Sequence, residues 1–214
     1  MENRTLRMNI ETQLSTVDVH ADPLASMLCN VEGEIPQSFL NNFSNDAVRA
    51  AVLVGLVERS SGFNILLTER AAHLNSHPGQ VSFPGGRIED CDKNPADAAL
   101  REACEEVGLK GEHATVVGCL ESVFTQTGFL VTPVVTFVSP EFQAVPDPTE
   151  VSEVFELPLG FVMNKEKRQL TYRKRFGLRM RSYEFLYGKH RIWGTTAAII
   201  VRFLELISNE KQNH

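Results

Sequence analysis

NPADAALREACEEVGL, residues 94–109, predicts a helix with a defined beginning and end. Asn94 is a favourable N-cap, and Pro95 suits the first helical position because its missing N–H is not needed there. Gly108 suits the left-handed residue that closes a helix. At about 100° per residue, one side of the helix carries the apolar residues that we expect to pack in the core, namely Ala96, Leu100, Ala103, Cys104 and Val107.

The opposite side of this helix is acidic, because Glu102, Glu105 and Glu106 fall within one arc of roughly 100°. Anions in the last turns oppose the helix macrodipole at about 0.3–1 kcal/mol each, and Glu102 and Glu106 also repel each other. Such residues usually form a solvated face. Here the preceding loop contains Gly85 and Gly86, which allow a backbone to bend closely around a ligand. We therefore expect the three glutamates to bind Mg²⁺ or Mn²⁺, which take carboxylate oxygens.

Residues 101–109, REACEEVGL, resemble the second half of the Nudix box at every fixed position. The first half departs from the pattern, since Gly86 lies fifteen residues before Arg101 instead of fourteen and Asp92 replaces the usual glutamate. This departure, together with the preceding segment 66–86, LLTERAAHLNSHPGQVSFPGG, is similar to the coenzyme A pyrophosphatase branch of the family. Further matches are VTPVV, EVSEVF and IWGTTA, at residues 131–135, 150–155 and 192–197.

The resemblance implies a Nudix-type α/β/α sandwich with a mixed β-sheet. Periodicity in the chain agrees, with β-rich runs at 50–57 and 64–68 around a Ser-Ser-Gly turn, and others at 114–121 and 130–139. Residues 170–172 and 183–187 are expected to pair around Gly177, and 197–207 to form a terminal helix. We expect a catalytic domain at 46–208. Residues 1–45 form an extension of unknown role, a dimer arm or a cover, with helical pieces near 16–30 and 36–42.

Several site residues follow from the resemblance. Arg101 is expected to orient a glutamate by an ion pair, and Gly86 to offer its carbonyl oxygen to the metal, unless it serves only the turn. His77, Gln80 and Gly85 are expected to contact substrate, although His77 could instead organise its loop.

Cleavage of a phosphoanhydride also needs a group that accepts the proton of the attacking water. The candidates are Glu105 on the helix and the pair Glu150 and Glu153. We favour Glu153 slightly, because an extended segment would place Val151, Glu153 and Phe155 on one side.

Lysines and arginines are concentrated between residues 165 and 181, namely Lys165, Lys167, Arg168, Arg173, Lys174, Arg175, Arg179 and Arg181. We interpret this basic segment as a solvated hairpin, with capture of a substrate phosphate as the alternative. Trp193 is expected in the core and, as the alternative, on a base-stacking surface.

The net charge of −6 over 214 residues argues against general binding of nucleic acid or anionic membranes. Four cysteines without paired spacing indicate reduced thiols. No apolar leader or run of about 20 apolar residues is present, so we expect a cytoplasmic protein. The resemblance alone suggests a homodimer.

The activity implied is metal-dependent hydrolysis of the diphosphate of coenzyme A or acyl-coenzyme A, which gives adenosine 3′,5′-bisphosphate and (acyl-)phosphopantetheine. The alternative substrate is another nucleoside diphosphate derivative, such as an ADP-sugar or a dinucleotide, because the acidic helix is common to all these enzymes. A third hypothesis is a sensor that binds nucleotide without cleaving it. Such binders usually lose box carboxylates, and all three are present here.

Overall fold

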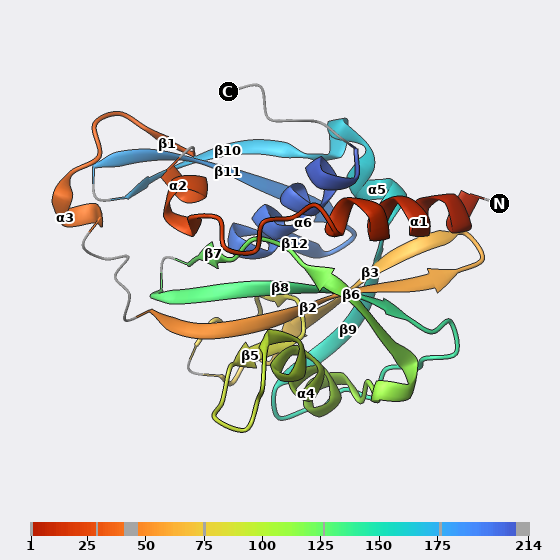
Figure 1. The fold of residues 1–214 in the computed structure, drawn as a ribbon. Helices are drawn as coiled ribbons and strands as arrows, with labels where there is room; N and C mark the ends of the chain where they lie inside the picture. The colour runs from red at the N-terminus through yellow and green to blue at the C-terminus, as the bar shows by residue number, and fades with distance from the viewer. Residues whose placement is uncertain are drawn as a thin grey trace.

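The computed structural model describes residues 2–28, 30–40, 47–74, 76–125, 127–175 and 177–208. Its centre is a mixed sheet that is covered by helices on both faces (Figure 1). Helix α4 (Pro95–Val107) packs on one face, and helices α1 (Glu2–Leu14) and α6 (Gly194–Ile207) pack on the other. The α/β/α architecture predicted from the sequence is confirmed.

The large sheet is built around two parallel strands, β2 (Val48–Arg59) and β8 (Phe129–Val138), which pair over ten residues each. Strand β3 (Gly62–Arg70) forms the predicted hairpin with β2. The order along the sheet is β4-β3-β2-β8-β6, with β9 on β3, β5 on β2 and β7 on β8. The remaining strands are β4 (Val81–Ser82), β5 (Gly85–Arg87), β6 (Ala114–Cys119), β7 (Val123–Phe124) and β9 (Val151–Pro158).

One edge of β2 is shared by two strands, and this division positions the site. Residues 56–59 of β2 pair with β3, whereas residues 50–52 pair with β5. Strand β3 therefore leaves β2 and continues beside β4. The chain crosses this split at Pro84, whose carbonyl oxygen accepts a 2.8 Å hydrogen bond from the Leu53 N–H. Gly85 and Gly86 consequently lie at the split, facing α4.

Helix α4 has the ends predicted from its sequence. The Asn94 side chain accepts hydrogen bonds from the N–H groups of Ala96 and Asp97, and Gly108 has φ 70° in the left-handed region. The prediction for one residue of its packing face is wrong, because Cys104 is exposed. Glu106 is buried instead, since the helix packs on β5 as well as on β2. The buried side of α4 is thus turned toward Gly85 and Gly86, compared with the side predicted from periodicity.

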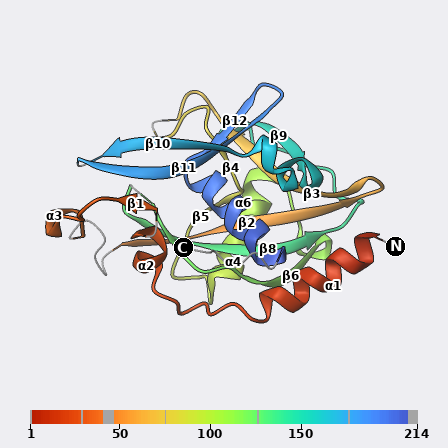
Figure 2. The same ribbon diagram turned by 90° about the horizontal axis from the view of Figure 1, so that it is seen from above.

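A smaller antiparallel sheet lies beside α6 (Figure 2). Strands β10 (Gln169–Arg175) and β11 (Leu178–Tyr187) pair around Gly177 as predicted, and β12 (His190–Trp193) pairs with the other end of β11. Strand β1 (Val31–Glu32) completes this sheet. Helix α5 (Leu159–Met163) follows β9, and single 3₁₀ turns lie at Gly111–His113 and Lys165–Lys167.

The N-terminal residues belong to this packed structure. Ile10 of α1 is fully buried in the same cluster as Phe203 of α6. Helices α2 (Pro23–Leu28) and α3 (Gln37–Leu40) fall within the two predicted helical pieces, although residues 41 and 42 of the second lie outside the described residues. Helix α1 was not expected from the sequence, because most of its residues are polar, but its few apolar side chains pack toward α6.

Candidate active site

The three helix carboxylates have different surroundings. Glu106 is only 3% exposed, and its Oε2 accepts a 3.3 Å hydrogen bond from the Gly85 N–H. Burial raises the pKa of Glu106 to about 8, because the loss of hydration outweighs this bond. The pKa of the partly buried Glu102 is also raised, chiefly by burial and against the effect of Arg101. Glu105 is exposed. A buried carboxylate with a raised pKa is the group that a bound cation would stabilise most.

The two glycines serve this site in different ways. A β-carbon on Gly86 would overlap the Glu102 carboxylate, so the glycine leaves room for that group. Gly85 has φ 152°, and a β-carbon there would overlap the Ala51 carbonyl oxygen. Gly85 is therefore required by the backbone of β2, and Gly86 by the glutamate.

Arg101 connects the helix to the loop before it. Its Nε and Nη2 atoms donate to the two carboxylate oxygens of Asp92, at 3.1 and 3.0 Å. Its Nη1 lies 2.9 Å from Oε1 of Glu102 and 3.4 Å from Oε2 of Glu105. The Arg101 guanidinium lowers the pKa of Asp92 and is held in a fixed orientation by the bidentate pair. Arg101 thus lies where it can orient Glu102.

Asp92 was not expected to have a role, although its place six residues after Gly86 in the sequence was a usable signal. It stands where the family pattern has an acid, and the extra residue before Arg101 is accommodated in the loop. Arg70 was also missed. Its charge lowers the pKa of Glu106, so the guanidinium lies near the carboxylates.

The loop between β3 and β4 is closed at its base by two backbone hydrogen bonds. The Arg70 N–H donates to the Gln80 carbonyl, and the Gly79 N–H donates to the Arg70 carbonyl, each at 3.0 Å. His77 has φ 56°, and its Nδ1 lies 2.9 Å from Oε1 of Gln80. These two residues therefore contact each other and shape the loop.

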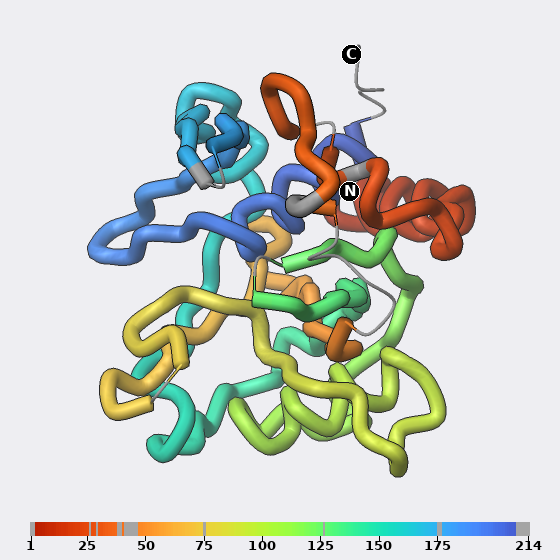
Figure 3. The backbone as a smooth tube through the Cα atoms, turned by 90° about the vertical axis from the view of Figure 1, so that its left-hand side faces the viewer, coloured from red at the N-terminus to blue at the C-terminus, as the bar shows by residue number. Residues whose placement is uncertain are grey.

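Glu150 lies near the carboxylates of α4 and is exposed. Its charge raises the pKa of both Glu102 and Glu106, and its carbonyl oxygen accepts a 2.8 Å hydrogen bond from the Ala71 N–H. Figure 3 shows the segment before β9 running beside the β3–β4 loop, and the His73 Nε2 lies 3.0 Å from the Thr149 carbonyl oxygen.

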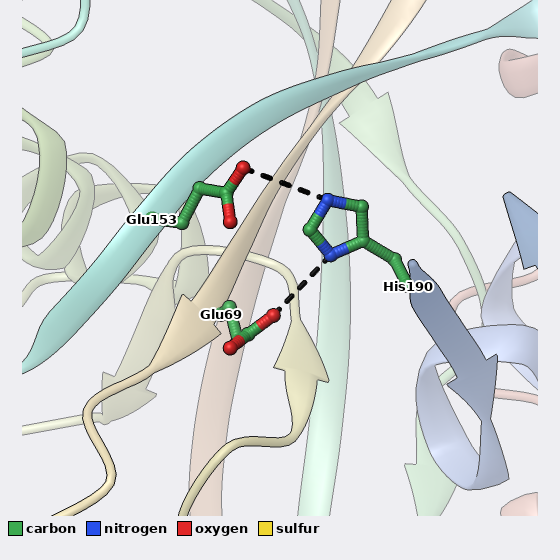
Figure 4. Close-up of side chains that lie close together, drawn as sticks. All are labelled: Glu69, Glu153 and His190. Atoms are coloured by element: carbon green, nitrogen blue, oxygen red, sulfur yellow. Dashed lines mark hydrogen bonds and ion pairs between the residues drawn. The ribbon is translucent and has the colours of Figure 1, made fainter. Parts of the chain in front are cut away.

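Glu153 belongs to a different group of side chains (Figure 4). Its carboxylate lies 2.5 Å from Lys189 Nζ and 3.7 Å from His190 Nε2, while His190 Nδ1 lies 3.3 Å from Glu69. Phe155 stacks on the His190 ring at 3.8 Å, as expected if Glu153 and Phe155 share one side of β9. Phe155 packs with the α6 cluster, whereas Val154 packs with the α4 cluster. Glu153 therefore lies on the sheet face opposite to α4.

Within the described ranges, Glu69, Glu153 and His190 are the one trio of potential metal ligands whose ligand atoms lie within 4.8 Å of one another. Imidazole and carboxylates together suit transition metals. Here Lys189 already neutralises Glu153, and its ammonium lowers the pKa of that carboxyl. The trio also joins the β11–β12 turn to β3 and β9. Neither Glu69 nor His190 was singled out from the sequence.

A cavity of about 790 Å³ lies next to the carboxylate site. His77, Gln80 and Gly85, the three residues expected to contact substrate, all line it. Trp193 also lines the cavity and is half-buried, so its expected place in the core is wrong. Residues from α2, β7, β10, β11 and α6 complete the wall. Among the described residues, no helix is both long and apolar enough to cross a membrane.

Comparison with known proteins gives concordant matches. The model of the NUDIX domain family matches residues 47–175. An Enterobacter sp. (strain 638) protein called uncharacterized Nudix hydrolase NudL is 41% identical over 152 residues, covering 71% of this chain and 79% of the relative. Its namesake from Cronobacter sakazakii (strain ATCC BAA-894) is 42% identical over 163 residues, or 76% and 84% of the two chains. The crystal structure of the Nudix hydrolase RenU from M. smegmatis aligns with TM-score 0.46 and 26% identity, covering 54% of this chain and 73% of that one.

The contrast between the two glycines gives a test of where a cation binds. Gly86→Ala should keep the fold, because the flexible Glu102 side chain can move, but should weaken Mn²⁺ binding about tenfold or more. Gly85→Ala should instead destabilise the protein by about 2–4 kcal/mol, because its β-carbon meets backbone atoms. Calorimetric titration with Mn²⁺ and thermal unfolding measure the two effects. Unchanged Mn²⁺ affinity in Gly86→Ala would show that Glu102 is not a ligand in this position.

Proposed function

This chain belongs to the Nudix family and is a pyrophosphohydrolase of nucleoside diphosphate derivatives, and we propose that its substrate is coenzyme A or an acyl-coenzyme A. Hydrolysis would release adenosine 3′,5′-bisphosphate and (acyl-)phosphopantetheine. The observation that carries this proposal is the cavity that extends from Gly85, beside Glu106, along His77 and Gln80. Its volume and its partly apolar wall suit a substrate with a long arm on the diphosphate.

A divalent cation fits the donor set of this site. Glu102 and Glu106 would hold it, with Glu105 and the Gly86 carbonyl as further ligands. Hard cations prefer such oxygens, and Glu106 is buried without a cationic partner within ion-pair distance among the described residues. When bound, a divalent cation polarises phosphoryl oxygens and acidifies water. We assign Mg²⁺ or Mn²⁺ to this position, and not to the trio of Glu69, Glu153 and His190.

The protein's own residues position the reactants. Asp92 fixes Arg101, and Arg101 fixes Glu102 at 2.9 Å, so the carboxylate is oriented before a ligand arrives. Arg70 lines the cavity near Glu106 and would bind a phosphoryl oxygen of the diphosphate. His77 and Gln80 shape the wall that the substrate contacts.

We assign the proton acceptor to Glu150, and not to Glu153, which the sequence slightly favoured. Glu150 lies close enough to influence Glu102 and Glu106, while Glu153 is held by Lys189 on the other face of the sheet. Glu105 is the remaining alternative, because it is exposed beside Arg101.

We further propose that residues 46–208 form the catalytic domain and that residues 1–45 cover it. Ile10 of helix α1 is buried in the same hydrophobic cluster as residues of the large sheet and α6. Pro23 and Met27 of α2 line the cavity, together with Asn30. The extension therefore completes the binding surface.

The substrate proposal is tested by measuring kcat/KM for coenzyme A and ADP-ribose under identical Mg²⁺ conditions, with identification of the products. Coenzyme A should be preferred and should yield adenosine 3′,5′-bisphosphate. Glu106→Gln should lower the rate by at least about 10²-fold, because the metal loses its buried ligand. A ratio that favours ADP-ribose would replace the coenzyme A assignment with the alternative substrate. Undiminished turnover by Glu106→Gln would remove the metal assignment.

The proton acceptor is tested by two matched variants three residues apart. Glu150→Gln should lower kcat by about 10²–10⁴-fold and remove the acidic limb of the pH–rate profile. Glu153→Gln should stay within about threefold of the wild-type rate, since a distant ion pair contributes nothing to proton transfer. A larger loss of kcat in Glu153→Gln than in Glu150→Gln would identify Glu153 as the proton acceptor. Unchanged pH–rate profiles in both variants would assign the proton acceptor to Glu105.

A further inference from the structure

The cavity contains arginines in a protein of net charge −6, and their partners differ. Arg202 forms an ion pair with Glu121, another residue of the wall, so their charges cancel. Arg70 lies near Glu106, where the proposed function would place the scissile diphosphate. Arg173 and Arg181 also line the wall, and Arg173 is the one whose guanidinium packs over the Trp193 ring.

Arg173 stands on β10 and packs over Trp193 of β12, with its guanidinium carbon 4.1 Å from the ring centroid. Across the described residues, no carboxylate lies within 4.0 Å of its guanidinium nitrogens. Glu184 is near enough for the charge of Arg173 to lower its pKa, although the hydrogen bonds from Arg191 do so more strongly. Arg191 occupies both oxygens of that carboxylate, at 2.8 and 2.7 Å.

This mode of packing leaves the arginine ready to bind an anion. A stacked guanidinium uses its face, whereas its N–H donors point outward in the plane. The ring thus fixes the group without consuming its hydrogen bonds. Arg173 is half-buried and stands on a paired strand opposite Met180, so little entropy is lost when a ligand binds. Coplanar donors of this kind can bind two oxygens of one phosphate.

We propose that Arg173, held against Trp193, is the binding site for a phosphate monoester that the substrate carries apart from its scissile diphosphate. The assignment rests on the proposed function, since it places a second part of the same substrate in the same cavity. A monoester is a fitting ligand because it carries a charge of about −1.5 to −2 and three acceptor oxygens. Two members of the basic segment at residues 165–181, Arg173 and Arg181, line the cavity, and Arg173 is the one that packs over the Trp193 ring.

The single tryptophan makes this site directly observable. Trp193 is the only one in the chain, so intrinsic fluorescence reports on the ring under Arg173. Metal-free protein is titrated with adenosine 3′,5′-bisphosphate and, separately, with adenosine 5′-monophosphate. The bisphosphate should bind about 10- to 100-fold more tightly, as expected for a charge-assisted bidentate contact.

Matched variants assign this difference to one side chain. Arg173→Met should abolish the preference for the bisphosphate while leaving the affinity for the monophosphate unchanged. Arg173→Lys should retain part of the preference, because it keeps the charge without the planar donor pair. Lys174→Met removes the same charge from the exposed neighbouring position and should change neither affinity.

Equal affinity of the wild-type protein for the two nucleotides would overturn the proposal. So would a preference that survives in Arg173→Met, or one that Lys174→Met removes to the same extent. The titration involves neither metal nor turnover. A protein that prefers the bisphosphate yet fails to hydrolyse coenzyme A would disprove the proposed substrate and leave this phosphate site standing.

Discussion

The burial of the Glu106 carboxylate against the Gly85 N–H is the interaction on which the site depends. It exists because β2 divides its edge between β3 and β5, which places two glycines below the last turns of α4. Without a counterion this arrangement is costly, as the raised pKa of Glu106 shows. The fold therefore maintains a carboxylate that gains stability when a cation binds, and this links the packing of the helix to its chemistry.

The other parts of the site are arranged around this carboxylate. Asp92 and Arg101 orient Glu102, whose position also requires a glycine at residue 86. The β3–β4 loop and the smaller sheet then form a cavity beside it, and α2 contributes to the wall. The trio of Glu69, Glu153 and His190 holds the β11–β12 turn against the large sheet, and β12 carries Trp193. These ion pairs lie on the α6 side of the sheet, and they support the strand whose Trp193 lines the cavity on that same side.

Local signals in the sequence predicted local structure well. Asn94, Pro95 and Gly108 determine the ends of α4 through backbone hydrogen bonds within a few residues, and the Ser60-Ser61-Gly62 turn determines the first hairpin. Tertiary packing decided the features that were wrong or missed. Cys104 is exposed and Glu106 is buried, the reverse of what helical periodicity predicts. The reason is that α4 packs on β5, and periodicity alone does not reveal this contact. The choice between Glu150 and Glu153 likewise depends on which face of β9 meets α4. Helix α1 was missed because its few apolar residues, such as Ile10, acquire partners only when α6 and the large sheet are in place.

A cation that binds the buried Glu106 must replace a proton there, and this exchange can be measured. In the metal-free protein, the folded state binds more protons than the unfolded state between the usual carboxyl pKa and about 8, so stability should fall as pH rises through that window. Metal binding at pH 7 should release about one proton per ion, and less at higher pH. Calorimetric titration with Mg²⁺ or Mn²⁺ in buffers of different ionisation enthalpy measures this number. Release of about one proton by the wild type and almost none by Glu106→Gln is expected, whereas equal release by both proteins would show that the cation does not displace a proton from Glu106.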